Sequence, residues 1–211
     1  MAETLLQAQQ LTISRGEVTL ISDTSFTIES GGLLQLQGDN GSGKTTLLRA
    51  LCTLIPLDEG EISWRGERLP GAREQYFSEM VYSGHADGLK SDLTPLENLQ
   101  SCLTEHTVTE AECREVLTRT GLAGKEQLAC KVLSAGQRRR VVLARLLLSQ
   151  STLWILDEPL TALDASGREL VAELIDEHVA QGGCVIFSTH QPLPSVSGNS
   201  HRQIQTLGLS G

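Results

Sequence analysis

The nine residues Gly38-Asp39-Asn40-Gly41-Ser42-Gly43-Lys44-Thr45-Thr46 follow the pattern G-x-x-x-x-G-K-[ST]. Apolar residues before them predict a buried strand, and Leu47-Leu48 after them predicts the opening of a helix. In this context the glycines let consecutive backbone N–H groups turn toward an anion, and the helix N-terminus adds partial positive charge. We therefore predict that residues 38–46 hold nucleotide phosphates, with a catalytic Lys44 at the β- and γ-phosphates and the Thr45 hydroxyl on Mg²⁺.

The chain as a whole has the composition of an ordinary globular protein, with 39% hydrophobic and 20% charged residues over 211 positions. Its formal net charge of −9 argues against broad nucleic-acid binding, so we expect no nucleic-acid partner. We see no apolar run long enough for a transmembrane helix and no secretory signal at the N-terminus. The five cysteines lack C-x-x-C spacing, so we expect reduced thiols in a cytoplasmic protein.

Hydrophobic patterning before and just after the glycine-rich loop predicts strands and one helix. Apolar and polar residues alternate over residues 5–28, with glycines at the turns, which predicts an antiparallel β-region. A helix is expected over residues 44–54, because Pro56 disfavours helical backbone at the residue before it. Residues 60–66 and 81–83 read as short strands.

The second half of the chain changes from helical patterns to an alternation of strands and helices. Residues 88–150 look helical, and Thr109 with Glu112 forms a capping box that predicts a helix start. Buried strands are then expected at 153–156 and 185–187, a helix between them at 166–181, and a late strand at 203–207. We predict one α/β domain over residues 1–211. It consists of a P-loop NTPase core with a mostly parallel sheet flanked by helices, an N-terminal antiparallel β-subdomain and an inserted α-helical subdomain at about 88–150.

Two adjacent carboxylates end one of the predicted strands. Asp157 and Glu158 follow the apolar run Leu153-Trp154-Ile155-Leu156. A strand that ends in an aspartate places a carboxylate at the edge of the sheet, where it can hold Mg²⁺ beside a phosphate-binding loop. We predict Asp157 as a metal ligand and Glu158 as the general base that activates the attacking water.

The segment Leu133-Ser134-Ala135-Gly136-Gln137 has two interpretations. As local structure, Ser134 and Gln137 form a capping box at a helix N-terminus, which is also an anion site. Between a P-loop and an Asp-Glu strand, the same segment resembles the signature of the ATP-binding cassette (ABC) ATPases. That resemblance implies that Ser134, Ala135, Gly136 and Gln137 contact ATP, that Ala162-Leu163-Asp164 is the D-loop, and that His190 is the catalytic switch histidine.

Three positions depart from the usual ABC pattern. Ala135 stands where the family usually has glycine. Its methyl group should be tolerated if the backbone is helical there, and the alternative is that it crowds the γ-phosphate. His85 falls at the position of the Q-loop glutamine, where an imidazole would only partly replace the amide. Arg15 aligns with the aromatic residue that normally stacks on adenine. A guanidinium plane can also stack on a base, and the alternative is an exposed turn residue.

The resemblance also implies partners. In the ABC family two chains sit head to tail, so that the P-loop of one and the signature of the other enclose each ATP. Residues 88–99 and 153–164 and the run Thr189-His190-Gln191-Pro192-Leu193 resemble the ATP-binding subunit of the cytochrome c maturation heme exporter. That subunit works at the cytoplasmic face of the bacterial inner membrane with integral membrane subunits. No direct heme site is expected, because the histidines and cysteines form no obvious ligand pair.

Other ABC ATPases remain alternatives at this point. A lipoprotein or metabolite transporter subunit, or an ABC ATPase with no transport role, would share the same nucleotide site. Four leucines of the helical region, Leu89, Leu93, Leu96 and Leu99, either offer an apolar groove to a membrane partner or build the core of their own subdomain. We favour the second interpretation.

Overall fold

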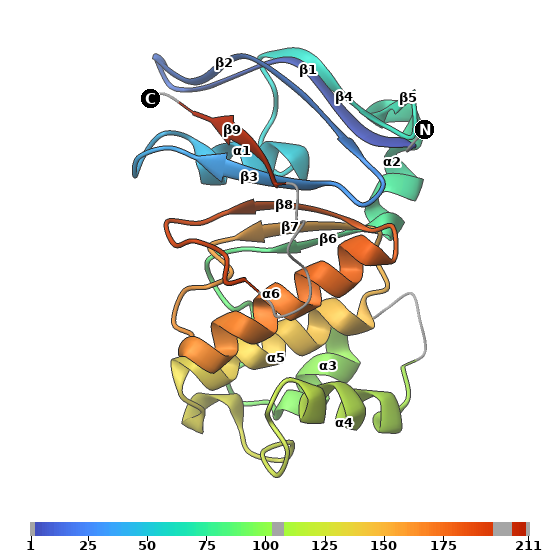
Figure 1. Cartoon of the computed structure of the whole chain (residues 1–211), viewed down its shortest axis with the longest axis vertical. Coiled ribbons are helices and arrows are strands. Elements are labelled where there is room, and N and C mark those ends of the chain that lie inside the picture. The colour runs from blue at the N-terminus through green and yellow to red at the C-terminus, as the bar shows by residue number, and fades with distance from the viewer. Residues whose placement is uncertain (1–2, 103–107, 196–203, 210–211) are drawn as a thin grey trace.

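Two β-sheets and the helices around them make up the protein in a computed structural model that describes residues 3–102, 108–195 and 204–209 (Figure 1). The four-stranded sheet has the order β2-β1-β4-β5, and the five-stranded sheet has the order β6-β7-β8-β3-β9. The predicted α/β class with an N-terminal antiparallel region is therefore confirmed.

The antiparallel sheet is formed by residues before the phosphate-binding loop and by a strand pair after it. β1 pairs with β2 and with β4, and all pairings in this sheet are antiparallel. The positive φ of Gly16 (63°) makes the turn between the first two strands, where a glycine avoids the steric cost that other residues meet. The strands span Thr4–Arg15 (β1), Val18–Glu29 (β2), Glu59–Trp64 (β4) and Glu67–Arg68 (β5).

The second sheet is parallel throughout its described pairs. Side chains alternate between its faces, as the period of a strand requires: Leu153 and Ile155 belong to one buried cluster, Trp154 and Leu156 to another. Its strands are Leu33–Gln37 (β3), Met80–Ser83 (β6), Leu153–Asp157 (β7), Cys184–Ser188 (β8) and Ile204–Gly208 (β9). The predicted late strand at 203–207 corresponds to β9, and residue 203 lies outside the described residues.

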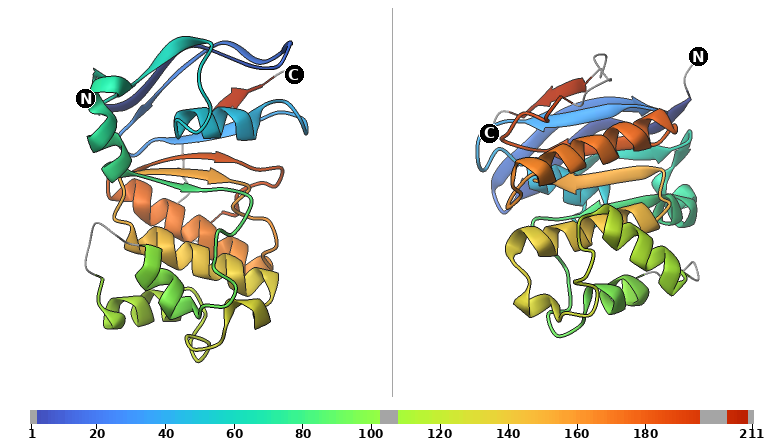
Figure 2. Two further views of the ribbon diagram at one scale, coloured as in Figure 1. Left: turned by 180° about the vertical axis from the view of Figure 1, so that it is seen from behind. Right: turned by 60° about the horizontal axis from the view of Figure 1, so that its bottom comes forward.

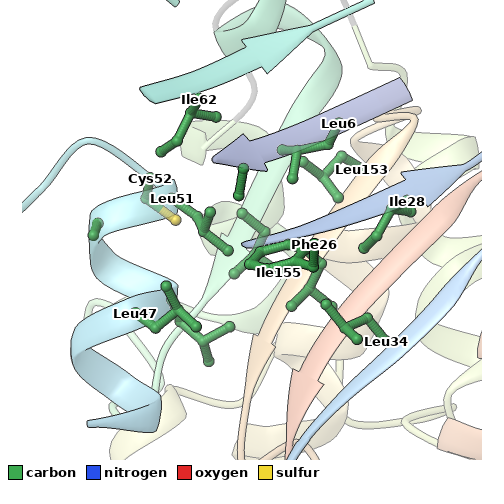
Figure 3. Packing of buried hydrophobic residues seen from close by; sticks show 14 of the residues in the cluster. Leu6, Phe26, Ile28, Leu34, Leu47, Leu51, Cys52, Ile62, Leu153 and Ile155 are labelled. Carbon is green, nitrogen blue, oxygen red and sulfur yellow. The ribbon is translucent and has the colours of Figure 1, made fainter. Parts of the chain in front are cut away.

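Helix α1 (Lys44–Leu51) lies between the two sheets, as both Figure 1 and Figure 2 show. Figure 3 shows its Leu47 and Leu51 packing among side chains from both sheets. The antiparallel sheet contributes Leu6, Phe26, Ile28 and Ile62 to this cluster, and the parallel sheet contributes Leu34, Leu153 and Ile155. This first cluster packs α1, which follows the phosphate-binding loop, against the parallel sheet, whose strand β3 precedes that loop.

Helices α5 (Ala135–Leu148) and α6 (Ala165–Ala180) lie on the opposite side of the parallel sheet (Figure 1). A second apolar cluster packs Leu143 and Leu146 of α5 and Val171 of α6 against the side chains that β7 and β8 direct toward these helices. The parallel sheet is thus covered on both faces, which agrees with its nearly continuous apolar strands.

The helices between β6 and β7 have their own apolar core. This third cluster packs Leu96 and Leu99 against α4 and against one side of α5, with Leu89 packed on it from outside. The leucines of this region therefore build the core of their own segment, as we favoured, while Leu93 is half-buried beside it. The elements are α3 (Pro95–Cys102), α4 (Glu110–Arg119) and the short 3₁₀ helix η1 (Cys130–Val132).

Both predicted capping boxes are present. Thr109 Oγ1 accepts from the Glu112 N–H, and the Glu112 carboxylate accepts from the Thr109 N–H at 2.8 Å. Ser134 and Gln137 make the same reciprocal pair at the start of α5. Each pair satisfies two backbone N–H groups that a helix N-terminus otherwise leaves free.

Two local features differ from the sequence prediction. Helix α1 ends at Leu51 and not near residue 54, because Thr53 takes a positive φ of 55° and its N–H bonds back to Ala50 O. Helix α2 (Leu69–Glu79) was not predicted. Pro70 and Gly71 in its first turn suggest a loop, although a proline is tolerated there because the first N–H groups of a helix have no partner.

Cys52, Cys113, Cys130 and Cys184 are buried free thiols. Burial raises the pKa of Cys52 and of Cys184 to about 12, so neither forms a reactive thiolate near neutral pH. Within the described ranges, none of the helices is both long and apolar enough to span a bilayer.

Candidate nucleotide-binding site

The predicted site residues gather at one edge of the parallel sheet. The strands β6, β7, β8 and β3 are neighbours in that order, and their carboxyl ends point the same way. His85 follows β6, Glu158 follows β7, His190 follows β8 and the glycine-rich loop follows β3. Ligands of open α/β sheets bind beyond the carboxyl ends of the strands, so this edge is the expected place for a site.

The glycine-rich loop has a backbone that side chains would obstruct. Gly38 and Gly43 have φ values of 150° and 92°, which L-residues with a side chain rarely adopt. A Cβ at Gly38 would lie 2.4 Å from Ser42 Oγ, and one at Gly43 would lie 2.8 Å from Ile21 Cδ1. The glycines thus allow the close turn that aims the first N–H groups of α1 at the pocket.

Lys44 is folded against the loop that carries it. Its Nζ donates to the carbonyl oxygens of Gly38 at 2.7 Å and Asp39 at 2.8 Å, and the residue is only 7% exposed. Burying an ammonium group is costly unless it has hydrogen-bond partners, and here two carbonyl oxygens accept hydrogen bonds from it. The positive charge is therefore held beside the N-terminus of α1, where an anion would meet both.

Asp157 is joined to two hydroxyl groups from other parts of the chain. Thr45 Oγ1 donates to Asp157 Oδ2 at 2.9 Å, and Ser188 Oγ donates to Oδ1 at 2.7 Å. Asp157 is 2% exposed and pairs in register with Ser188 across β7 and β8. The carboxylate and the Thr45 hydroxyl form a set of oxygen donors, the kind that Mg²⁺ prefers. The described residues contain no group of three or more His, Cys, Asp or Glu side chains placed for a metal.

Glu158 has an unusual backbone that its neighbours hold in place. Its φ is 52°, in the left-handed region that costs a non-glycine residue about 1 kcal/mol or more. The Glu158 N–H donates to Ser188 O at 3.2 Å and to Ser188 Oγ at 3.1 Å. Its Oε1 lies 3.3 Å from Nε2 of His190. The turn thus presents the carboxylate to the pocket next to the histidine.

A pocket of about 570 Å³ collects most of the predicted residues. Arg15 is exposed at the end of β1 and lines this pocket, and His85 is exposed and lines it too. Gly38, Asp39 and Ser42 do not line it, and the hydroxyl of Ser42 is buried beneath the loop. The lining residues are Arg15, Leu20, Asn40, Gly41, Gly43, Lys44, Thr45, Thr46, His85, Asp157, Glu158, Thr161 and His190.

The segment Ser134–Gln137 does not line this pocket. Ser134 and Ala135 are exposed at the N-terminus of α5. A Cβ on Gly136 would lie 3.0 Å from the carbonyl oxygen of Ala162, so the segment borders the loop at 162–164. Asp164 caps α6 by accepting from the Gly167 N–H at 2.8 Å, and Arg140 Nη2 donates to the same carboxylate at 3.2 Å.

Three further residues belong to the site although the sequence did not single them out. Ser188 bonds both acidic residues, and Leu20 and Thr161 line the pocket. The place of Ser188, two residues before His190 at the end of a predicted strand, is the signal that could have found it. Leu20 and Thr161 carry no local signal, because their role depends on how separate segments pack.

The ABC transporter family profile matches residues 21–161. The chain belongs to the ABC transporter family. The match takes in the phosphate-binding loop, the segment Ser134–Gln137 and the carboxylates Asp157 and Glu158, and His190 lies beyond it. As a member of this family, the chain is an ATP-binding and ATP-hydrolysing transporter subunit.

Relatives within the ABC family match nearly the whole chain. The cytochrome c biogenesis ATP-binding export protein CcmA of Nitrosospira multiformis is 48% identical over 202 residues, which cover 95% of this chain and 98% of that protein. CcmA of Escherichia coli is 47% identical over 189 residues, 90% of each chain. Both relatives are therefore similar in length as well as in sequence.

Solved structures of ABC proteins share the fold. An ATP-binding subunit of an ABC transporter superposes with a TM-score of 0.79 at 27% identity and covers 88% of this chain and 79% of its own. A protein of Pyrococcus furiosus described as an ABC transporter ATP-binding protein superposes with a TM-score of 0.81 at 24% identity, covering 97% of this chain and 96% of its own. The second likeness concerns the fold alone.

Proposed function

We propose that this chain is the ATP-hydrolysing subunit of an ABC exporter that acts in cytochrome c biogenesis. The observation that carries this proposal is the pocket at the ends of four parallel strands, which contains Lys44, Asp157, Glu158 and His190 together. The likeness of the whole chain to CcmA proteins supports the process in which it acts.

ATP would bind with its phosphates against residues 38–46. Lys44 Nζ would exchange its bonds to Gly38 O and Asp39 O for phosphate oxygens, which offer full negative charge. The first N–H groups of α1 add hydrogen bonds to the same phosphates. Arg15, exposed at the pocket mouth, is placed to stack its guanidinium on adenine.

Thr45 and Asp157 are the residues that would hold Mg²⁺, directly or through water, and His85 would contribute from the neighbouring loop. When bound, Mg²⁺ neutralises charge on the phosphate oxygens. The Thr45 hydroxyl donates its proton to Asp157, which leaves its oxygen lone pairs free for a cation. The hydrogen bond from Ser188 Oγ keeps the Asp157 carboxylate oriented.

Glu158 would take the proton of the attacking water, and His190 would orient that water and the γ-phosphate. The 3.3 Å approach of the two side chains supports a shared task at one point of the pocket. Because the Glu158 backbone is fixed by Ser188, the carboxylate needs little rearrangement to act.

A second copy of the chain would complete each site. Ser134, Ala135, Gly136 and Gln137 form a helix N-terminus away from their own pocket, with Ser134 and Ala135 exposed, so this segment is placed to reach ATP held by a partner. Head-to-tail pairing would then close on ATP and open after hydrolysis.

ATP hydrolysis would drive either the delivery of heme to a heme chaperone or the release of heme from that chaperone. The ATPase would act at the cytoplasmic face of the bacterial inner membrane. Integral membrane subunits would hold it there. The likeness of the chain to cytochrome c biogenesis ATP-binding export proteins supports this step.

The first test is Glu158→Gln in the full chain. We expect the ATP hydrolysis rate to fall by about 100-fold or more, because a general base contributes on the order of 10²–10⁴ to the rate. ATP binding should persist, and gel filtration with ATP should show a dimer. Glu115→Gln, the same change at an exposed position on α4, is the control.

Unchanged hydrolysis by Glu158→Gln would show that this carboxylate is not the base. The transport assignment has its own test, purification of the membrane complex with the tagged chain. Co-purification of heme-handling membrane subunits supports the proposal. Recovery of lipoprotein-sorting or metabolite-transport subunits in their place would contradict it.

A further inference from the structure

Arg139 is a buried cation that contacts the backbone of the two acidic residues of the site. It lies on α5, two residues after the segment Ser134–Gln137, and is only 4% exposed. Its neighbours Arg138 and Arg140 are half-buried and bond to other loops. A run of three arginines on a helix points its side chains in three directions, and the middle one enters the protein.

The Arg139 guanidinium joins two loops of the site through their backbones. Nη2 donates to the carbonyl oxygens of Asp157 at 3.3 Å and Glu158 at 3.1 Å. Nη1 donates to the carbonyl oxygen of Gly84 at 3.2 Å, just before His85. A single rigid fork therefore holds the end of β7 and the loop after β6 at a fixed separation.

Acidic residues around Arg139 offset only part of the cost of burying its charge. Burial, together with the nearby charge of Arg145, lowers the pKa of Arg139, and the negative charges of Asp87, Asp157 and Glu158 act in the opposite direction. Its Nε is buried without a hydrogen-bond partner among the described residues. An unmade bond at a buried donor is costly, so it offsets part of what the hydrogen bonds of the other two guanidinium nitrogens contribute.

The backbone that Arg139 contacts is the strained one. Glu158 has a φ of 52°, which persists only when neighbouring groups hold it. Its N–H is held by Ser188, and its carbonyl is held by Arg139. The backbone N–H and the backbone carbonyl of Glu158 are thus both held by hydrogen bonds.

We propose that Arg139 is a positioning residue for hydrolysis, which holds Glu158 in its working geometry from helix α5 and is anchored on its other side by Gly84 O in the loop after β6. Because the same helix begins with Ser134–Gln137, any shift of its N-terminus moves the Arg139 fork together with it. This inference rests on the role proposed above for Glu158.

The test uses Arg139→Met, Arg139→Gln and Arg139→Lys in the full chain, assembled with the membrane subunits that co-purify with it. We expect kcat for ATP hydrolysis to fall about 10- to 100-fold in the Met and Gln variants, because small displacements of catalytic groups have effects of this size. KM for ATP should change little, since Arg139 does not line the pocket. Arg139→Lys keeps the charge and should recover part of kcat.

A double variant separates positioning from a general loss of structure. In the Glu158→Gln background, adding Arg139→Met should lower the residual rate by less than about twofold, because the group that it positions is gone. The inference would be overturned if Arg139→Met lowered kcat in the Glu158→Gln background as much as it does in the parent. A parental kcat in Arg139→Gln would overturn it as well. Arg114→Gln, which removes an exposed pair with Glu110 on α4, is the matched control and should behave as the parent.

Further outcomes separate a folding defect and an error about the general base from an error about the positioning role. If Arg139→Met does not fold, Arg139→Lys takes its place in the double variant, and the same criterion applies. If Glu158→Gln alone hydrolyses ATP at the parental rate, the proposed base is wrong. A parental rate in Arg139→Gln beside an inactive Glu158→Gln contradicts only the positioning role.

Discussion

Nε2 of His190 lies 3.3 Å from Oε1 of Glu158, and the two side chains come from the ends of adjacent parallel strands. The Glu158 side chain is 19% exposed, while that of His190 is 47% exposed. The carboxylate is thus sheltered and the imidazole reaches into the pocket. This arrangement suits a base that is held still and a partner that contacts the substrate.

His190→Ala should reduce ATP hydrolysis far more than ATP binding. We expect kcat to fall about 100-fold or more, because in the proposed mechanism the imidazole contacts the reacting groups while Lys44 and residues 38–46 would still hold the phosphates. Steady-state hydrolysis and the binding of a fluorescent ATP analogue measure the two effects. If affinity falls as far as kcat, His190 serves binding and not the chemical step.

Lys44→Ala should show the reverse pattern. Losing a charged donor to phosphate should weaken ATP binding by about 10- to 100-fold, since charge-assisted hydrogen bonds contribute about 1.5–3 kcal/mol each. Calorimetric titration with ATP measures the change. Lys131→Ala, which removes an exposed lysine paired with Asp92, is the control. Parental affinity in Lys44→Ala would disprove the role given to residues 38–46.

The sequence predicted those parts of the site whose signal is local. Residues 38–46 and the pair Asp157–Glu158 sit at strand ends that follow continuous apolar runs, so their place at the sheet edge follows from pattern alone. Both capping boxes were found for the same reason, since each is complete within four residues. Such features need no knowledge of distant contacts.

Other features depend on packing between distant segments. Which of Arg138, Arg139 and Arg140 is buried depends on the rotation of α5 against the sheet, which the sequence does not reveal. Ser188 bonds Asp157 because β7 and β8 pair in one register. Helix α2 was not predicted because only three of its residues, Leu69, Ala72 and Tyr76, are buried. Three buried residues are too few to give a clear apolar stripe in the sequence.

His178 should make folding stability depend on pH. It stacks on Trp154 with ring centroids 4.0 Å apart, its Nε2 lies 3.0 Å from Thr152 O, and burial lowers its pKa below the usual 6.5. The unfolded chain therefore binds a proton more readily than the folded one, so stability is lost as pH falls below about 6.5.

His178→Gln should weaken this pH dependence, because glutamine can donate to Thr152 O but does not titrate. Urea unfolding between pH 5 and pH 8 measures the effect at each pH. We expect the free energy of unfolding of the parent to decline toward acid more steeply than that of the variant. Equal slopes for the two proteins would show that the buried imidazole is not the group responsible.

The proposed dimer predicts that two inactive variants recover activity when mixed. Lys44→Ala removes the phosphate contact, and Ala135→Glu places a negative charge at the exposed N-terminus of α5. That charge favours the helix itself but repels the phosphate of a partner's ATP, so the variant should fold well and still be inactive. Ala123→Glu, at another exposed position, is the control for the added charge.

In a head-to-tail dimer of the two variants, one site carries both defects and the other carries neither. An equal mixture that exchanges subunits should therefore have intact residues at about a quarter of its sites and hydrolyse ATP accordingly. Each variant alone should remain inactive at the same concentration. A mixture that stays inactive after exchange is confirmed would mean that Ser134–Gln137 and the P-loop do not share a site across two chains.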